Sequence, residues 1–263
     1  MGQAKEPAAA KKRVRVAAVA DLHCTKTSQG AFQPLFAQIA DRADILLLCG
    51  DLTDHGAPEE AQILLKELSS AVKVPIIAVL GNHDWHAGKQ DELDKLLSDA
   101  GIQVLDGESC EVLGVGFAGA KGFCGGFGKH TLEAWGEEAV KRFVYEAVEE
   151  SLKLEKALAR MATPQKIAIL HYAPVQSTVE GEPPAIFPFL GSSRLEEPLD
   201  RYQVTAVFHG HSHHGKAEGK TKSGIPVYNV SLPVLRQAGA EQPPFRVLEL
   251  NVAQAPAAEL VRT

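Results

Sequence analysis

The sequence predicts an α/β fold built on a β-sheet that is buried on both faces. Short apolar runs rich in Val and Ile alternate along the chain with amphipathic segments of helical period. The runs are continuously apolar, which is typical of strands covered on both faces, whereas half-exposed strands alternate apolar and polar residues. Residues of metal-ligating type follow the runs directly. Ligands of such sheets bind outside the carboxyl ends of the strands, so these residues should gather at one edge.

The apolar runs that lead into these polar residues are the predicted core strands. They cover residues 14–20, 45–49, 76–80, 167–170 and 204–208. Amphipathic segments between them predict helices over Gln33–Asp41, Pro58–Ser70 and Lys89–Ala100. Pro58 suits a first helical turn, because the N–H that proline lacks has no partner there. Two further strands are expected over residues 225–230 and 245–250.

The middle of the chain predicts elements that are extra to a minimal sheet. Residues 110–118 resemble two short strands of a hairpin. The glycine-rich stretch Gly119–Gly128 predicts a flexible loop near the site, with a structural role favoured over substrate contact. Leu132–Met161 predicts one long, highly charged helix with a solvated face. Ala173–Pro198 contains five prolines and predicts a lid or a loop that frames the substrate.

The length of 263 residues fits one large domain. No repeat or linker divides the chain, so we expect a single domain over residues 14–263. It would carry a helical insertion near 129–162 and a lid loop near 173–198. Residues 1–13 are expected to be a disordered tail, although a targeting or partner-binding arm is the alternative.

Composition narrows the classes of function. The net charge of −6 disfavours non-specific binding of nucleic acid or anionic membranes, which requires clustered Lys and Arg. No apolar stretch reaches the ~20 residues that a membrane span needs. The four cysteines are scattered and no secretory signal precedes them, which predicts reduced thiols in the cytoplasm. Cys24, beside His23, is read as a small apolar residue at a strand end rather than as a metal ligand or redox group.

The polar residues at the strand ends predict a metal site. Asp21 and His23 are two residues apart, so an extended backbone places both side chains on one side. His211 and His213 repeat this spacing after another strand. Asp51 follows Gly50, which permits a close approach of the backbone.

Asn82 adds a neutral amide oxygen and His171 adds an imidazole, each at the end of its own strand. Oxygen and imidazole ligands suit Zn, Mn or Fe, and the absence of clustered cysteine argues against a structural thiolate site. Two Asp, one Asn and four His are too many ligands for one ion. A carboxylate can bridge two cations, so the set predicts two metals, which together would attract phosphate and activate water against it.

The order of these motifs resembles the calcineurin-like metallophosphoesterase superfamily. The motifs are Asp21-x-His23, Gly50-Asp51, Gly81-Asn82-His83-Asp84, His171 and Gly210-His211-x-His213. Each motif is weak by itself, whereas all five in this order are specific, and they span most of the chain. The resemblance implies a four-layer αββα sandwich of two mixed β-sheets flanked by helices.

The resemblance also implies roles for the site residues. Asp21, His23 and His213 would hold one metal, Asn82, His171 and His211 the other, and Asp51 would bridge them. His83 would be the general acid or phosphate contact, and Asp84 would orient its ring. Asp54 is expected to form a hydrogen bond to a ligand rather than to coordinate. The remaining histidines are read mainly as neighbours without a direct role, and they are His55, His86, His130, His209 and His214.

The function implied is a metal-dependent phosphoesterase that uses a bridging hydroxide on a small phosphorylated substrate. The stretch Gly50-Asp51-Leu52-Thr53-Asp54 resembles the small bacterial phosphodiesterases, so diesters are favoured over monoesters. An Arg typical of the protein Ser/Thr phosphatases is absent from this motif, which disfavours phosphoprotein substrates. The alternatives are a catalytically silent scaffold and a nuclease of the same superfamily.

Overall fold

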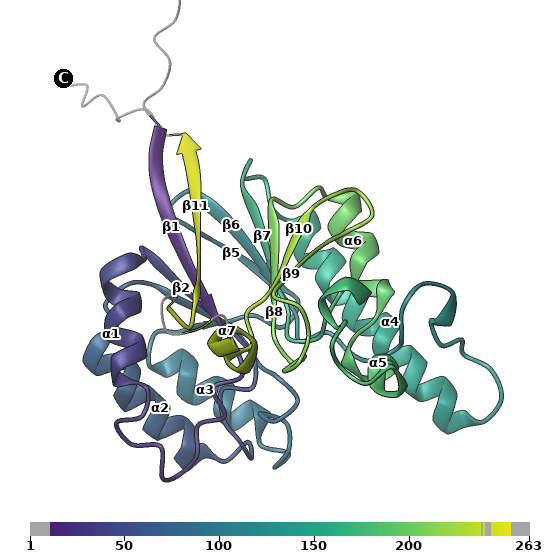
Figure 1. Cartoon of the computed structure of the whole chain (residues 1–263), viewed down its shortest axis with the longest axis horizontal. Coiled ribbons are helices and arrows are strands. Elements are labelled where there is room, and N and C mark those ends of the chain that lie inside the picture. Colours follow the sequence, from purple (N-terminus) through teal and green to yellow (C-terminus); the bar gives the residue numbers. More distant parts are fainter. Residues whose placement is uncertain (1–10, 238, 240–242, 254–263) are drawn as a thin grey trace, which may run out of the picture.

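The computed structural model describes residues 11–237, 239 and 243–253, and within them two β-sheets are stacked face to face (Figure 1). The first sheet has the order β11-β1-β2-β3-β4 and the second has the order β5-β6-β7-β8-β10-β9. The strands of the first sheet are β1 (Lys11–Val19), β2 (Ile45–Cys49), β3 (Ile76–Val79), β4 (Gln103–Val104) and β11 (Arg246–Ala253). Those of the second are β5 (Glu108–Val112), β6 (Val115–Gly119), β7 (Lys166–Ile169), β8 (Ala206–His209), β9 (Glu218–Lys220) and β10 (Pro226–Asn229).

Both sheets are mixed, with a parallel centre and at least one antiparallel edge strand each. In the first sheet β1 to β4 run parallel and β11 runs antiparallel beside β1. In the second sheet β6, β7, β8 and β10 run parallel, whereas β5 and β9 are antiparallel at the edges. The carboxyl ends of the parallel strands form the edge where ligands bind in folds of this kind.

Helices cover the outer face of each sheet, which completes the predicted four layers (Figure 1). Successive side chains of β2 alternate between two cores: Leu46 packs with the helices, and Leu47 packs between the sheets. The first sheet is covered by α1 (Gln33–Arg42), α2 (Pro58–Ala71) and α3 (Gln90–Asp99). A third core joins the second sheet to α4 (Glu138–Ala159) and α6 (Glu196–Arg201). The short helix α7 (Leu232–Gln237) follows β10.

Most predicted elements are found with ends shifted by one or two residues, but the long helix is shorter than expected. It begins at Glu138 rather than at Leu132. Gly136 has a φ of +75°, a left-handed conformation that a helix cannot contain, and the polypeptide turns there. A one-turn helix, η1 (Gly128–His130), lies before this break.

The beginning of the described chain also differs from expectation. Lys11–Arg13 belong to β1 and pair with Asn251–Ala253 of β11, so these three residues are not part of a tail. Pairing with β11 gives the backbone N–H and C=O groups on this side of β1 partners that they would lack if β1 were the edge strand. Residues 1–10, which the sequence predicts to be disordered, lie outside the described residues.

Of the two segments predicted as loops near the site, the first is largely buried and the second is only partly buried. Most of Gly119–Phe127 is buried between α4 and the segment that follows β7. The predicted lid over 173–198 holds three one-turn helices and α5 (Phe187–Leu190) before α6 begins, and the one-turn helices are η2 (Gln176–Thr178), η3 (Pro184–Ile186) and η4 (Ser193–Leu195). Backbone hydrogen bonds from the N–H of Gly126 to the carbonyl of Gly191, and from the N–H of Ser193 to the carbonyl of Gly126, tie the two segments together.

Candidate metal centre

The carboxyl ends of five strands from both sheets meet at one edge, as the sequence predicts. The ring of His171, which follows β7, reaches across to the first sheet and donates from Nδ1 to the carbonyl of Cys49 at 3.1 Å. The backbone N–H of His211, which follows β8, donates to the carboxylate of Asp21 at 3.0 Å. Among the described residues, three groups of three possible ligands have their ligand atoms within 4.8 Å of one another. Two of them consist of predicted ligands, and they are Asp21, His23 and His213, and Asp51, His171 and His211. The third joins His23 to Asp54 and His83.

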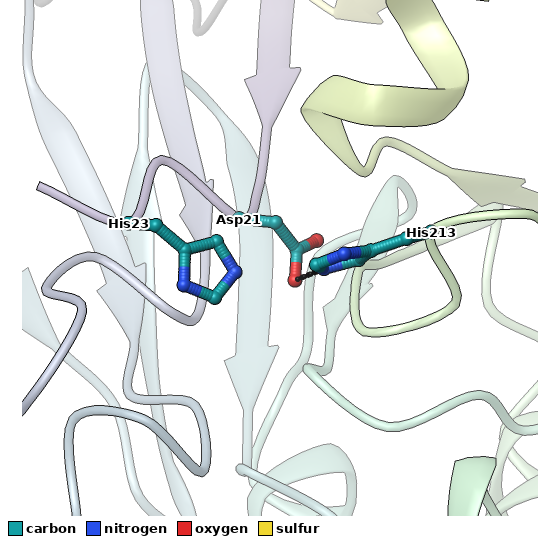
Figure 2. A group of neighbouring side chains, drawn as sticks. All are labelled: Asp21, His23 and His213. Atoms are coloured by element: carbon teal, nitrogen blue, oxygen red, sulfur yellow. Dashed lines mark hydrogen bonds and ion pairs between the residues drawn. The ribbon is translucent and has the colours of Figure 1, made fainter.

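The first of these groups, which we call the outer pocket, consists of Asp21, His23 and His213. Figure 2 shows the Asp21 carboxylate between the two imidazoles, with His213 joined to it. His213 Nε2 lies 3.0 Å from Asp21 Oδ1, and this hydrogen bond raises the pKa of His213. The His23 side chain is 21% exposed and that of His213 is 34% exposed, so the outer pocket faces solvent.

The second group, with Asn82 added, forms what we call the inner pocket: Asp51, Asn82, His171 and His211. His171 Nε2 lies 2.8 Å from Asn82 Oδ1 and 3.3 Å from Asp51 Oδ1. The side chain of His171 is fully buried and that of Asp51 is 2% exposed. Asp51 lies between the pockets, because its other oxygen, Oδ2, is 3.8 Å from His23 Nε2. This is the position that a bridging carboxylate would occupy.

Hydrogen bonds fix which nitrogen of each ring is available to a cation. A backbone carbonyl only accepts, so His171 carries its proton on Nδ1 and turns Nε2 inward. His211 donates from Nε2 to the carbonyl of Phe189 at 3.1 Å, which leaves Nδ1 free. His23 Nδ1 lies 3.1 Å from Asp54 Oδ1, and its Nε2 is buried without a partner in the described part of the chain. Such outer hydrogen bonds are what hold metal ligands in place.

The side chains of the inner pocket have the chemistry that a bound metal ion requires. His171 Nε2, Asn82 Oδ1 and Asp51 Oδ1 are three acceptors at close range, and only a proton or a cation between them can be stable. Without a cation the proton stays: burial opposes it, but the charge of Asp51 raises the pKa of His171 to about 9. Burial acts against ionised Asp51 too, yet His171 and the N–H of His83 hold its pKa well below the usual value. Because metal ligation needs neutral imidazole, a bound ion would replace this proton.

Three glycines make room for the pockets. A Cβ on Gly50 would lie 2.4 Å from the ring of His171, and one on Gly81 would lie 2.2 Å from Asp51 Oδ1. A Cβ on Gly210 would lie 2.4 Å from Asp21 Oδ2. The close approach predicted at Gly50 is therefore confirmed, and the glycines after β3 and β8 serve the same purpose.

The backbone at the candidate ligands is strained. Asp21, His23, Asp51 and His211 have φ between +46° and +68°, a left-handed conformation that costs side-chain-bearing residues about 1–3 kcal/mol each. Only two other non-glycine residues in the described part of the chain, Leu113 and Gln203, share it. Strain of this kind persists where the surrounding structure holds it, and it turns successive side chains of Asp21-x-His23 toward one centre. The spacing argument for an extended backbone is therefore wrong in detail, since a left-handed turn, rather than a strand, brings these two residues together.

His83 lies at the outer pocket, with its ring centroid 4.5 Å from that of His23. Its Nδ1 donates to the carbonyl of Asp54 at 2.7 Å, so its Nε2 is the atom free to exchange a proton. The expectation that Asp84 orients this ring is wrong. The Asp84 carboxylate instead accepts the N–H groups of Leu52, Thr53 and Gly81 and the hydroxyl of Thr53. Asp84 thereby holds together the loops that follow β2 and β3, and Asp54 is the residue that positions His83 and His23.

The sequence predicts that His209 is a neighbour without a direct role, and both of its ring nitrogens form hydrogen bonds outside the two pockets. Nδ1 lies 2.8 Å from the carbonyl of Gly210 and Nε2 lies 2.8 Å from Thr178 Oγ1. Complete burial lowers the pKa of His209 to about 4, which keeps the ring neutral. His209 therefore ties β8 to the segment that follows β7.

Cys24 is buried beside the site, and burial raises the pKa of its thiol to about 11, as expected for a packing residue.

Comparisons with known proteins agree with this geometry. The calcineurin-like phosphoesterase family model matches residues 14–215. The chain therefore belongs to the calcineurin-like phosphoesterase family. No curated protein matches the chain. None of the helices that the structure describes is long and apolar enough to cross a membrane.

Solved structures share the fold at low sequence identity. Phosphopantetheinyl Hydrolase (PptH) from Mycobacterium tuberculosis has a TM-score of 0.64 and 15% identity, and the match covers 92% of this chain and 96% of that one. GAP50, described as the anchor in the inner membrane complex of Plasmodium, has a TM-score of 0.58 and 15% identity, with 90% and 81% covered. TT1561 of Thermus thermophilus has a TM-score of 0.53 and 15% identity, with 91% and 99% covered. These likenesses show the two-sheet fold.

Proposed function

We propose that this protein is a metal-dependent hydrolase of phosphodiesters, with weaker action on phosphomonoesters. The observation that carries the proposal is the convergence of seven candidate ligands in two adjoining pockets with His83 beside them. The outer pocket would hold one ion through Asp21, His23 and His213, and the inner pocket would hold the other through Asn82, His171 and His211. Asp51 would contact both. The oxygen and imidazole donors suit Mn, Fe or Zn.

Two bound divalent ions lower the pKa of water and stabilise the charge of a phosphoryl group under attack. The residues of the chain would orient the metal ligands and the substrate. The carbonyls of Cys49 and Phe189 direct one nitrogen of His171 and one of His211 into the inner pocket. His83, held through Nδ1, presents Nε2 to the leaving oxygen of the ester and would deliver a proton there.

A matched assay on an aryl phosphodiester and an aryl phosphomonoester, with added manganese, tests the proposal. We expect turnover of both, with the diester preferred. His83→Ala should lower kcat by about 10²–10⁴ for the diester while the metal content stays the same. His86→Ala, an exposed histidine three residues further on, is the control and should leave kcat unchanged. Metal-loaded protein without diester turnover would contradict the proposal.

A scaffold without catalysis is the second candidate function, because GAP50, one of the structural neighbours, is described as an anchor. A scaffold does not need a complete metal centre. Metal analysis therefore separates the two, since fewer than one tightly bound transition ion per chain would favour the scaffold. We also propose that the protein works in the cytoplasm, because its four cysteines are scattered and free in the described residues.

A further inference from the structure

A buried ammonium group beside the metal centre has no carboxylate partner in the part of the chain that the structure describes. Lys121 follows β6 and is 7% exposed. Its Nζ donates to the carbonyl of Gly122 at 2.9 Å, and no other acceptor is found for it among the described residues. Three aromatic rings surround it, with Nζ 5.0 Å from the centroid of Phe123 and 5.5 Å from those of Trp85 and Tyr172. Aromatic faces attract an ammonium group but leave its N–H donors unused.

The position of Lys121 connects it to the candidate metal centre. Its backbone carbonyl accepts the N–H of His171 at 3.0 Å. The ring of Tyr172, which contacts the ammonium group on one side, lies 4.4 Å from the ring of His211 on the other. Trp85 follows His83 by two residues in the same turn. One layer of side chains therefore separates this lysine from the residues that would hold the substrate phosphoryl group.

Lys121 and Trp85 line a cavity of about 90 Å³, and the rest of its lining combines the apolar side chains of Leu80, Val104 and Leu105 with residues that carry hydrogen-bond acceptors. Gln90 contributes a buried Oε1 that has no partner in the described residues. Asp91 and Asp94, from the first turns of α3, line the cavity from its exposed side. Asp106 lines it too, but its carboxylate is paired with Lys153 at 2.9 Å. Trp85 itself is 39% exposed, so part of its surface is open to solvent.

The charges around this cavity select the class of ligand. An anion would be attracted by the ammonium group of Lys121 but repelled by the carboxylates of Asp91 and Asp94. A cation would be attracted by these carboxylates but repelled by the ammonium group. A neutral group with several hydroxyls satisfies both walls, because each hydroxyl accepts one hydrogen bond and donates another. The partly exposed face of Trp85 would pack against the C–H groups of such a ligand.

We propose that Lys121, Trp85, Gln90 and the Asp91–Asp94 turn form a subsite for a neutral polyhydroxyl group of the phosphoester substrate. This inference rests on the proposed function and names the class of alcohol that the substrate carries. Lys121 donates to one hydroxyl oxygen, Gln90 and the aspartates accept from hydroxyl hydrogens, and the phosphoryl group lies at the metal pockets next to His83.

Four 4-nitrophenyl phosphodiesters that differ only in the second alcohol test the proposal. The alcohols are 2,3-dihydroxypropyl, propyl, a trimethylammonium ethyl group and a carboxyethyl group. We expect kcat/KM for the dihydroxypropyl ester to exceed that for the propyl ester at least about tenfold, because a site built for hydroxyls disfavours an analogue without them. The two charged esters should be poorer than the dihydroxypropyl ester.

Variants assign this preference to the cavity. Lys121→Met keeps the length of the side chain among the aromatic rings, and it should reduce the preference to about twofold, mainly by lowering kcat/KM for the dihydroxypropyl ester. Lys73→Met is the matched control, because Lys73 also donates to a single backbone carbonyl but is exposed and does not line the cavity. Asp91→Asn with Asp94→Asn, both on the exposed side, should improve the carboxyethyl ester selectively. If Lys121→Met fails to fold, Gln90→Leu provides the same test, with the same loss of preference expected.

A binding experiment separates this proposal from the proposed function. The chain has two tryptophans, so Trp135→Phe leaves Trp85 as the only fluorescent reporter. Metal-free protein is titrated with methyl 2,3-dihydroxypropyl phosphate and with methyl propyl phosphate. A change of Trp85 fluorescence with the first compound at several-fold lower concentration supports the subsite, even if no ester is hydrolysed. Equal responses to both compounds, or a substrate preference that survives in both Lys121→Met and Gln90→Leu, would overturn it.

Discussion

The outer and inner pockets use the same kinds of ligand but differ in how the protein encloses them. The side chain of His213 in the outer pocket is 34% exposed, whereas that of His171 in the inner pocket is fully buried. The outer histidine His23 is oriented by a side chain, Asp54, and the inner histidines are oriented by backbone carbonyls. A backbone carbonyl moves less than a side-chain carboxylate, because no rotatable side-chain bonds separate it from the chain. We therefore expect the inner pocket to retain an ion, and the outer pocket to exchange ions and meet substrate.

The largest effect should come from the residue that both pockets share. Asp51→Asn removes one negative charge between two cations and leaves a side chain that bridges them poorly, so we expect kcat/KM for the diester to fall by about 10³ or more. Metal analysis should show that the content falls from two ions per chain to one or none. Full metal content in this variant would contradict the assignment of Asp51 to both pockets.

Chelation tests the difference between the pockets directly. We expect a chelator to remove the ion of the outer pocket at least about tenfold faster than that of the inner pocket, because the outer side chains of His23 and His213 are 21% and 34% exposed whereas the inner side chains of His171 and Asp51 are buried. A time course of metal content should then show two phases. His213→Ala should abolish the fast phase and keep the slow one, and a single phase in the unmodified protein would contradict the comparison.

Asp54→Asn sharpens the comparison at the outer pocket alone. Loss of the carboxylate weakens the hold on His23 Nδ1, and changes of this kind typically reduce metal affinity about 10–100-fold. Titration with manganese should show this loss for one of the two ions only. Asp41→Asn, an exposed aspartate on α1, serves as a control and should leave both affinities unchanged.

Gly191→Ala should have the smallest effect on metal binding, and this effect should concern the inner pocket. A Cβ there would lie 1.9 Å from the carbonyl of Ala173, so the segment that carries the Phe189 carbonyl must shift away from His211. We expect about tenfold weaker binding of the inner ion, together with a lower Tm. Phe189→Ala is the matched control: it removes a ring that is 55% exposed and keeps the carbonyl, so the affinity should not change.

The sequence alone was sufficient to predict most of the strands and the polar residues at the ends of the central ones. Continuous apolar runs such as Ile45–Cys49 have few alternatives to a buried strand, and parallel strands bring their carboxyl ends to one edge. The four-layer arrangement and the two groups of candidate ligands came from the family resemblance, and the structure brings these residues together as expected. The elements that the sequence missed are β4, β9, α5, α6, α7 and the one-turn helices, which have at most six residues and too little periodicity to be recognised.

Tertiary structure decided how each ligand is held. Ring orientation depends on carbonyls that are distant in sequence, such as Cys49 for His171, 122 positions away, and no local pattern encodes such a contact. Asp84 is adjacent to His83 along the chain, yet its carboxylate is used by the backbone of Leu52 and Thr53, and Asp54 is the residue near the rings. The cavity beside Lys121 likewise assembles residues from four separate segments.

The sequence thus determined which residues are available for metal chemistry and at which edge of the fold they lie, because hydrophobic periodicity and strand direction are local properties. Only the tertiary structure decided which nitrogen of each histidine turns inward, how deeply each pocket is enclosed, and that Lys121 is buried without a carboxylate partner among the described residues. Those features arise from contacts between segments that are far apart in the chain, and their energies depend on burial that the folded structure alone establishes.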